Sequence, residues 1–193
     1  PVNFDIKELY DDNIEIIHSL AKWKRMALKR YNIECGKGIY TDMNAIRRDE
    51  ILDNLHSVYV DQWDWEKVIS KKDRNLDFFK NTVRLIMKSL KETENEINNI
   101  YENLEPFVCE NVYFITSQEL ENMYPNLSPK QREYQIVKKY STVCIMQIGD
   151  ILKSGKKHDG RAPDYDDWSL NGDILIYYPI LDCVVEISSM GIR

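Results

Sequence analysis

Residues 173–190, DILIYYPILDCVVEISSM, contain two apolar segments joined by a short turn. Residues 173–178 and 183–190 are rich in the β-branched and aromatic side chains that favour strands. The four residues between them, 179–182, suit the connection of a β-hairpin. This stretch therefore predicts two neighbouring antiparallel strands.

The register of this hairpin decides which acidic side chains meet. If Tyr178 pairs with Cys183, then Asp173 lies opposite Ser188, and both share a face with Glu186. The two carboxylates become diagonal neighbours, roughly 7–8 Å apart at the backbone, and can share a divalent cation with nucleotide phosphates. A surface hairpin with alternating acids is the alternative. The apolar neighbours disfavour it, because acids in an apolar sheet need partners.

The rest of the sequence alternates between helical and strand-like patterns. Helices are expected over residues 19–31 with Ser19 as N-cap, over 75–104, and over 128–140 with Ser128 as N-cap and Pro129 in the first position. Strands are expected at 14–17, 39–46, 56–68, 111–116 and 142–148. Several strands in succession, with helices between them, predict an α+β fold built on a largely antiparallel sheet flanked by helices.

Length and composition limit the possible classes of protein. The 193 residues carry 26 basic and 32 acidic side chains, a net charge of −6, which argues against a nucleic-acid-binding surface. No apolar run reaches the roughly 18 residues that span a bilayer. The four cysteines lie far apart and are expected to be reduced thiols, so we expect a cytoplasmic protein with neither nucleic-acid nor membrane partners. Without a Pro-, Gly- or Ser-rich linker, one domain over residues 1–193 is expected.

The sequence DQWDW at residues 61–65 combines polar and aromatic side chains. In an extended chain Gln62 and Asp64 share one face, and Trp63 and Trp65 share the other. We expect the tryptophans to bury a large apolar area against a layer of helices. On the opposite face, Asp64 can accept from the ammonium of a zwitterionic molecule while Gln62 donates to its carboxylate. A polar, solvated strand face is the alternative.

Two further segments concentrate charge. Residues 161–168, RAPDYDDW, combine one arginine, three carboxylates and two aromatic rings around a proline, which predicts an ordered loop or else an acidic surface turn. Residues 18–25, HSLAKWKR, place cations near the start of a helix, where the helix dipole disfavours them. A bound anion or a carboxylate partner would explain them, and a basic solvated face is the alternative.

Five segments together resemble one family, the ammonia-dependent asparagine synthetases or aspartate–ammonia ligases. They occur in the expected order across the chain: HSLAKWKR (18–25), LHSVYVDQWDWE (55–66), RAPDYDDW (161–168), LNGDIL (170–175) and EISSMGIR (186–193). The resemblance implies a fold similar to class II aminoacyl-tRNA synthetases, normally as a homodimer. It also implies a ligase that uses ATP and Mg²⁺ to join aspartate and ammonia into asparagine through a β-aspartyl-adenylate, releasing AMP and pyrophosphate.

The resemblance implies roles for individual residues. Arg47 would grip the α-phosphate and act in catalysis with Lys24 and Asp166. We expect Asp166, or else Asp64, to take a proton from ammonium. The aspartate substrate would be bound by Ser19, Gln62, Asp64, Arg161, Tyr165 and Ser189. ATP would be contacted by His18, Arg47, Leu55, Asp173, Ile174, Glu186 and Ser188, with Asp173 and Glu186 also holding Mg²⁺.

The family is longer than this sequence. It extends beyond both ends and has a longer loop between Ser169 and Leu170, so we expect the 193 residues to be part of a longer chain. One alternative is an aspartyl- or asparaginyl-tRNA synthetase core, which the negative net charge and the lack of an anticodon-binding barrel disfavour. The other is a non-catalytic paralogue that binds an amino acid or AMP, which the intact RAPDYDDW segment and hairpin acids disfavour.

Overall fold

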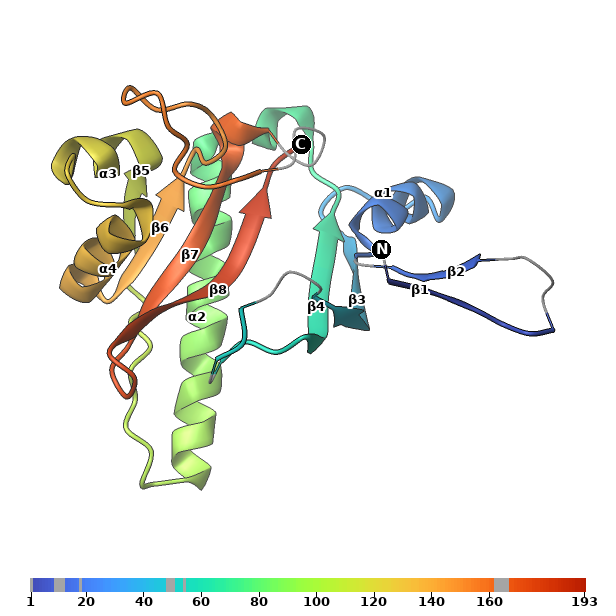
Figure 1. Ribbon diagram of the computed structural model, residues 1–193, viewed down its shortest axis with the longest axis horizontal. Coiled ribbons are helices and arrows are strands. Elements are labelled where there is room, and N and C mark those ends of the chain that lie inside the picture. The colour runs from blue at the N-terminus through green and yellow to red at the C-terminus, as the bar shows by residue number, and fades with distance from the viewer. Residues whose placement is uncertain (1, 9–12, 18, 48–50, 54, 162–166) are drawn as a thin grey trace. The chain divides into compact units, whose positions relative to one another are not determined.

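The computed structural model describes residues 2–8, 13–17, 19–47, 51–53, 55–161 and 167–193. Its contacts divide the chain into two compact units, Pro1–Lys71 and Lys72–Arg193, here called unit 1 and unit 2 (Figure 1). The single catalytic domain expected over residues 1–193 is not tested by this division and stays a prediction.

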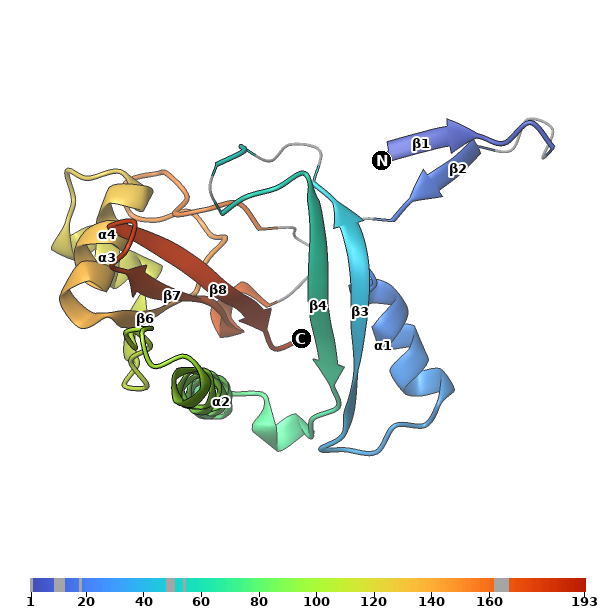
Figure 2. The ribbon, with the colours of Figure 1, turned by 90° about the horizontal axis from the view of Figure 1, so that it is seen from below.

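Unit 1 consists of two antiparallel hairpins and one helix. Its elements are β1 (Val2–Asp5), β2 (Asn13–Ile16), α1 (Ala21–Arg30), β3 (Gly38–Ile46) and β4 (Tyr59–Lys67). β1 pairs with β2 and β3 pairs with β4. Helix α1 packs against one side of the β3–β4 ribbon (Figure 2). The predicted strands of this unit are confirmed, although β4 begins only at Tyr59.

The start of α1 differs from the prediction. The N-cap is Leu20, which makes no side-chain capping bond. Ser19 instead lies one residue further out, where its Oγ accepts a hydrogen bond from the backbone N–H of Ala21 at 3.1 Å. The prediction of Ser19 as N-cap is therefore wrong, although its hydroxyl still satisfies one amide at the helix start.

Unit 2 is a four-stranded sheet with helices on both faces. Its elements are η1 (Lys71–Asp73, at the boundary with unit 1), α2 (Leu76–Ile100), β5 (Tyr113–Thr116), α3 (Ser117–Met123), α4 (Pro129–Tyr140), β6 (Thr142–Met146), η2 (Trp168–Leu170), β7 (Asn171–Tyr178) and β8 (Cys183–Gly191). The strand order is β5-β6-β7-β8, with β5–β6 parallel and the other pairs antiparallel. In Figure 1, α2 runs along one face of this sheet, and α3 and α4 lie on the other. The predicted α+β class with a largely antiparallel sheet is confirmed.

The core of unit 2 lies on both faces of the central strands. One cluster joins α3 and α4 to the sheet through Ile115, Leu120, Ile136, Val137, Val143, Ile145, Ile148 and Leu175. Helix α2 contributes the fully buried side chains of Phe79, Val83 and Met87. Because side chains alternate along a strand, successive residues of β7 point to opposite faces of the sheet.

Helix starts in unit 2 follow from their capping residues. Asn75 caps α2 by accepting from the N–H of Phe78 at 2.9 Å, and Ser128 forms a capping box with Gln131 at the start of α4. The predicted cap Ser128 is confirmed, and Asn75 lies at the predicted start of the long helix. Helix α3 was not predicted, because its seven residues follow β5 directly and are too few to display a helical period. Its capping box of Thr116 and Glu119 was the available signal.

Gly172 of β7 leaves no room for a side chain. A Cβ at this position would lie 2.6 Å from the Ile145 carbonyl oxygen and 3.1 Å from Phe79 Cζ. G172A is therefore expected to lower the free energy of unfolding by about 1–3 kcal/mol, measured by urea denaturation. G160A is the matched control, since nothing lies within 4 Å of its added Cβ. Equal stability of the two variants would contradict this packing.

The β7–β8 hairpin contains a bulge that the sequence pattern did not reveal. Pairing follows the predicted register from the turn up to Leu175 and Glu186. Beyond that point β8 has one extra residue, so Asp173 pairs with Ser189 instead of Ser188. The predicted pairing of Asp173 with Ser188 is therefore wrong, because strict alternation does not hold through a bulge. Among the described residues, no helix is long and apolar enough to cross a membrane.

Candidate active site

Lys24 is a fully buried cation within unit 1. Its side chain has 0% exposure, and its Nζ donates to Asp64 Oδ2 at 2.7 Å and to Thr41 Oγ1 at 2.9 Å. The ammonium has three donors, and these two acceptors use two of them. A buried charge paired in this way can offer its remaining donor to a ligand carboxylate. Thr41 was not predicted as part of the site.

The sequence of α1 explains why Lys24 lies beneath the helix. Ala21, Lys24 and Ala27 form its buried stripe, at steps of three residues. The two alanines allow the helix backbone to approach the β3–β4 ribbon closely, and the lysine side chain then reaches the strands between them. The next residue of the helix, Arg25, forms an ion pair with Glu66 of β4, with 3.6 Å between Arg25 Nε and Glu66 Oε1.

Gln62 shares the face of β4 that carries Asp64. Alternate residues of this strand are partly buried, which places both side chains toward α1. Gln62 Oε1 is buried and has no hydrogen-bond partner within the described part of the chain. An unpaired buried oxygen costs free energy that a ligand donor would recover. Because the amide can rotate, the same group can present either an acceptor or a donor.

The tryptophans of β4 do not pack as expected. Trp63 is 77% exposed and Trp65 is 43% exposed, on the face opposite Gln62 and Asp64. Their prediction as a buried layer against a helix is wrong, because α1 packs on the polar face and engages Asp64 through Lys24. Trp63 stacks instead on Tyr40 of β3, with ring centroids 6.3 Å apart.

The remaining residues predicted in unit 1 are separate from Lys24. Arg47 is exposed directly after β3, where its backbone N–H donates to the Val58 carbonyl at 2.7 Å. Leu55 is 47% exposed, and its N–H donates to Asp53 Oδ1 at 2.7 Å. His18 lies outside the described residues. In the described ranges, no hydrogen bond or ion pair joins Arg47 or Leu55 to the Lys24–Asp64 pair.

In unit 2 the carboxylate of Asp173 is buried and paired with an arginine. Asp173 is 5% exposed and accepts a hydrogen bond from Arg161 Nη2, while Arg161 Nη1 donates to Ser189 Oγ at 2.8 Å. Burial raises the pKa of Asp173, and the attraction of Arg161 offsets only part of that effect. The bulge thus places Ser189 beside Asp173, the position that the simple register assigned to Ser188.

Glu186 lies on the same sheet face as Asp173, opposite Leu175. Desolvation and the negative charge of Asp173 raise the pKa of Glu186 to about 7, although its side chain is exposed at the sheet surface. Two carboxylates that repel each other in this way form an oxygen donor set that suits a divalent cation. Among the described residues, no group of three or more His, Cys, Asp or Glu could hold a metal. A cation here would therefore complete its shell with water or substrate oxygens.

The raised pKa of Glu186 predicts a pH dependence of stability without added metal. In the unfolded chain Glu186 has its ordinary pKa of 4.5, whereas in the folded protein its pKa is about 7. The stability that Glu186 contributes in its protonated form is therefore fully present below pH 4.5 and is lost as the pH rises through about 7. E186Q should flatten that part of the pH profile of unfolding free energy, measured by urea denaturation. A parent and variant with parallel profiles would contradict the arrangement.

Two described residues of the RAPDYDDW segment, Arg161 and Asp167, are anchored within unit 2. Arg161 is bound to Asp173 at one end. At the other end Asp167 accepts from Arg74 and from the backbone N–H of Ser169, the latter at 2.9 Å. Tyr165 and Asp166, two of the predicted site residues, lie outside the described residues.

Comparison with known proteins identifies the family. The family model described as aspartate-ammonia ligase matches residues 1–193. The chain belongs to the aspartate–ammonia ligase family. The aspartate–ammonia ligase of Ruminiclostridium cellulolyticum is 60% identical over 100% of this chain and 57% of its own length. That of Fusobacterium nucleatum is 61% identical over 100% of this chain and 58% of its own length. The chain thus spans little more than half the length of these relatives.

A solved structure supports the predicted architecture. Asparaginyl-tRNA synthetase from Entamoeba histolytica aligns with 91% of this chain and 42% of its own chain, with a TM-score of 0.51 and 10% sequence identity. At that identity the likeness concerns the fold alone. It confirms the expectation of a class II-synthetase-like fold for this member of the aspartate–ammonia ligase family.

The structure brings together two groups of residues that the resemblance to aspartate–ammonia ligases assigns to the site. In unit 1 these are Lys24, Gln62 and Asp64. In unit 2 they are Arg161, Asp173, Glu186 and Ser189. Ser188 pairs with Ile174 on the opposite sheet face, and the Ile174 side chain is fully buried. The roles of all these residues, including the predicted ATP contacts, stay predictions.

Sequence reasoning missed a charged group beside the acids of unit 2. Lys130 and Glu133, three residues apart at the start of α4, join His158 from the segment after β6. Sequence patterns indicate no role for His158, whose partner Glu133 is 25 residues away in the chain. The i,i+3 spacing of Lys130 and Glu133 was the only local signal.

Proposed function

We propose that the chain carries catalytic groups of an ATP-dependent ligase that converts aspartate and ammonia to asparagine. The observation that carries the proposal is the match of the aspartate–ammonia ligase model to all 193 residues. Relatives named aspartate–ammonia ligase, at about 60% identity, support the same conclusion. In this proposal the charged residues around Lys24 bind the aspartate substrate, and those around Asp173 bind Mg²⁺ at the phosphates of ATP.

In the first proposed step, aspartate is activated by adenylation. A β-carboxylate oxygen of aspartate attacks the α-phosphorus of ATP, forming an O–P bond while the bond to the leaving pyrophosphate breaks. The attacking carboxylate is already ionised at neutral pH, so no general base is needed. Arg47 would neutralise charge that develops on the α-phosphate oxygens. Mg²⁺, with Asp173 and Glu186 as its protein ligands, would supply further positive charge at the phosphates.

The group around Lys24 would hold the aspartate substrate. Lys24 has a third N–H for a substrate carboxylate, because Asp64 and Thr41 use the other two. Asp64 Oδ1 would accept a hydrogen bond from the substrate ammonium. The side-chain amide of Gln62, whose Oε1 has no partner within the described residues, would hydrogen-bond to the substrate.

In the second proposed step, ammonia displaces AMP. The nitrogen forms a C–N bond at the β-carbonyl carbon, and the C–O bond to AMP breaks, with the electron pair leaving on the AMP oxygen. A base must accept the extra proton. We assign that role to Asp166 in preference to Asp64, because Asp64 is already bound to Lys24 at 2.7 Å.

Product analysis with the full-length protein tests the proposal. Aspartate, ATP, Mg²⁺ and ammonium should give asparagine, AMP and pyrophosphate in equal amounts. Without ammonium, exchange of labelled pyrophosphate into ATP should persist and depend on aspartate. Formation of ADP and phosphate, aminoacylation of tRNA, or binding of ligands without turnover would each contradict it. The homodimer and the cytoplasmic location implied by the resemblance stay predictions.

A further inference from the structure

A buried histidine–carboxylate pair lies on the α4 side of the sheet in unit 2. His158 Nε2 and Glu133 Oε1 are 3.1 Å apart, with side-chain exposures of 1% and 8%. His158 Nδ1 is also buried, yet it has no hydrogen-bond partner within the described ranges. A histidine retained only for packing normally satisfies both ring nitrogens when buried. Between described residues, the one hydrogen bond of the ring is directed at Glu133.

Glu133 in turn holds a lysine. Its Oε2 accepts from Lys130 Nζ at 2.9 Å, and the Lys130 side chain is 74% exposed. Burial opposes ionisation of Glu133, but the hydrogen bonds from His158 and Lys130 outweigh it and keep its pKa below the ordinary value. Glu133 is therefore a fixed anion, and it tethers the end of a side chain that would otherwise sample many rotamers.

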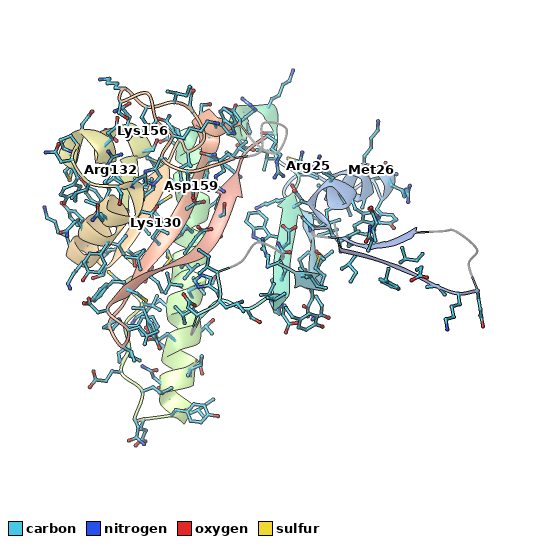
Figure 3. The ribbon with its side chains drawn as sticks, viewed as in Figure 1. Arg25, Met26, Lys130, Arg132, Lys156 and Asp159 are labelled. Carbon is cyan, nitrogen blue, oxygen red and sulfur yellow. The ribbon has the colours of Figure 1, made fainter. Side chains whose placement is uncertain are left out.

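Lys130 also faces the acids proposed to hold magnesium. It interacts electrostatically with Glu186 and Asp159, and Glu186 interacts with Asp173. Figure 3 labels Lys130 on α4 and Asp159 in the segment between β6 and β7, on the same side of the sheet. A lysine with two further N–H donors next to a carboxylate pair has the chemistry of a phosphate ligand.

We propose that His158 and Glu133 position Lys130 to bind the outer phosphates of ATP, which leave as pyrophosphate. This inference rests on the proposed adenylation, because it concerns the leaving group of that step. Lys130 is the residue that touches the phosphates. His158 and Glu133 are positioning residues, which act by limiting where the ammonium can lie.

Calorimetric titration of the full-length protein with inorganic pyrophosphate in the presence of Mg²⁺ tests the inference directly. K130M should weaken pyrophosphate binding about 10–100-fold, the range expected for a lost charge-assisted hydrogen bond. AMP, which lacks the outer phosphates, should bind K130M and the parent equally. K156M removes an exposed lysine of the neighbouring segment (Figure 3) and is the matched control, expected to bind both probes as the parent does.

The positioning role of His158 and Glu133 is tested by comparing pyrophosphate affinity with AMP affinity, because a purely structural defect would change both. H158A should weaken pyrophosphate binding by a smaller factor than K130M while leaving AMP affinity unchanged, and H158Q, which can still donate to Glu133, should recover part of the loss. If H158A weakens pyrophosphate and AMP binding alike, its role is structural and the positioning claim is wrong. Parent-like pyrophosphate affinity in K130M, or no pyrophosphate binding by the parent, would overturn the inference.

These outcomes are separable from failure of the proposed function. Pyrophosphate and AMP binding can be measured whether or not the protein makes asparagine. K130R, which keeps the charge, should retain pyrophosphate binding and shows whether a K130M defect reflects loss of charge or misfolding. A parent that binds pyrophosphate through Lys130 yet yields no asparagine would refute the ligase proposal and leave the phosphate site in place.

Discussion

Replacing Lys24 by methionine is expected to weaken aspartate binding strongly and to destabilise unit 1. The variant removes a cation of 0% exposure from Asp64, whose side chain is 17% exposed. Breaking a buried ion pair leaves the partner charge uncompensated, so we expect a loss of about 3 kcal/mol in the free energy of unfolding. Loss of a charge-assisted contact to the substrate should weaken aspartate binding by more than about tenfold. Urea denaturation and calorimetric titration with aspartate measure the two effects.

A double variant separates the two effects of Lys24. K24M/D64L replaces both charges by apolar side chains, and such exchanges of a buried pair are often neutral or stabilising. It should therefore recover most of the stability but none of the aspartate binding. K29M, at an exposed lysine of the same helix, should change neither quantity. Aspartate binding by the double variant at parental affinity would show that Lys24 has only a structural role.

The second large effect is expected for D173N, and it should appear in activity alone. The variant removes one of two carboxylates assigned to Mg²⁺, so aspartate-dependent exchange of pyrophosphate into ATP should fall by about 10²–10³-fold. Burial raises the pKa of Asp173, which means that the folded protein disfavours its ionised form. At neutral pH and without added metal, the unfolding free energy of D173N should therefore equal or exceed that of the parent.

The control for D173N is D150N, at an exposed aspartate that accepts, among the described residues, from the neighbouring Ile151 N–H alone. It should change neither exchange nor stability. If D173N is instead strongly destabilised without metal, the ion pair with Arg161 contributes more than the burial costs. The assignment of Asp173 as a strained, functional carboxylate would then be wrong.

Alternation along single strands predicts much of the candidate site, because side-chain direction in a regular strand has a period of two residues. It correctly places Gln62 and Asp64 on one face of β4, and Asp173 and Glu186 on one face of the hairpin. It fails at Ser188 and Ser189, because a bulge depends on how two strands pair and leaves no mark in either strand alone.

Contacts between distant segments were not predictable from local patterns. The face on which α1 packs is decided by Lys24 and Asp64, forty residues apart, and the exposure of Trp63 follows from that choice. His158 and Glu133 are separated by 25 residues and meet only when the segment after β6 returns to α4. The capped helices starting after Asn75 and Ser128 were predictable, since caps act within a few residues.

The most direct test of the ligase account follows the oxygen atoms of aspartate. With oxygen-18 in the β-carboxylate of aspartate, attack on the α-phosphorus and displacement by ammonia should transfer one labelled oxygen into AMP, which mass spectrometry of the full reaction would detect. AMP that carries no label while asparagine accumulates would contradict the adenylate route and the roles assigned here to Lys24, Asp173 and Glu186.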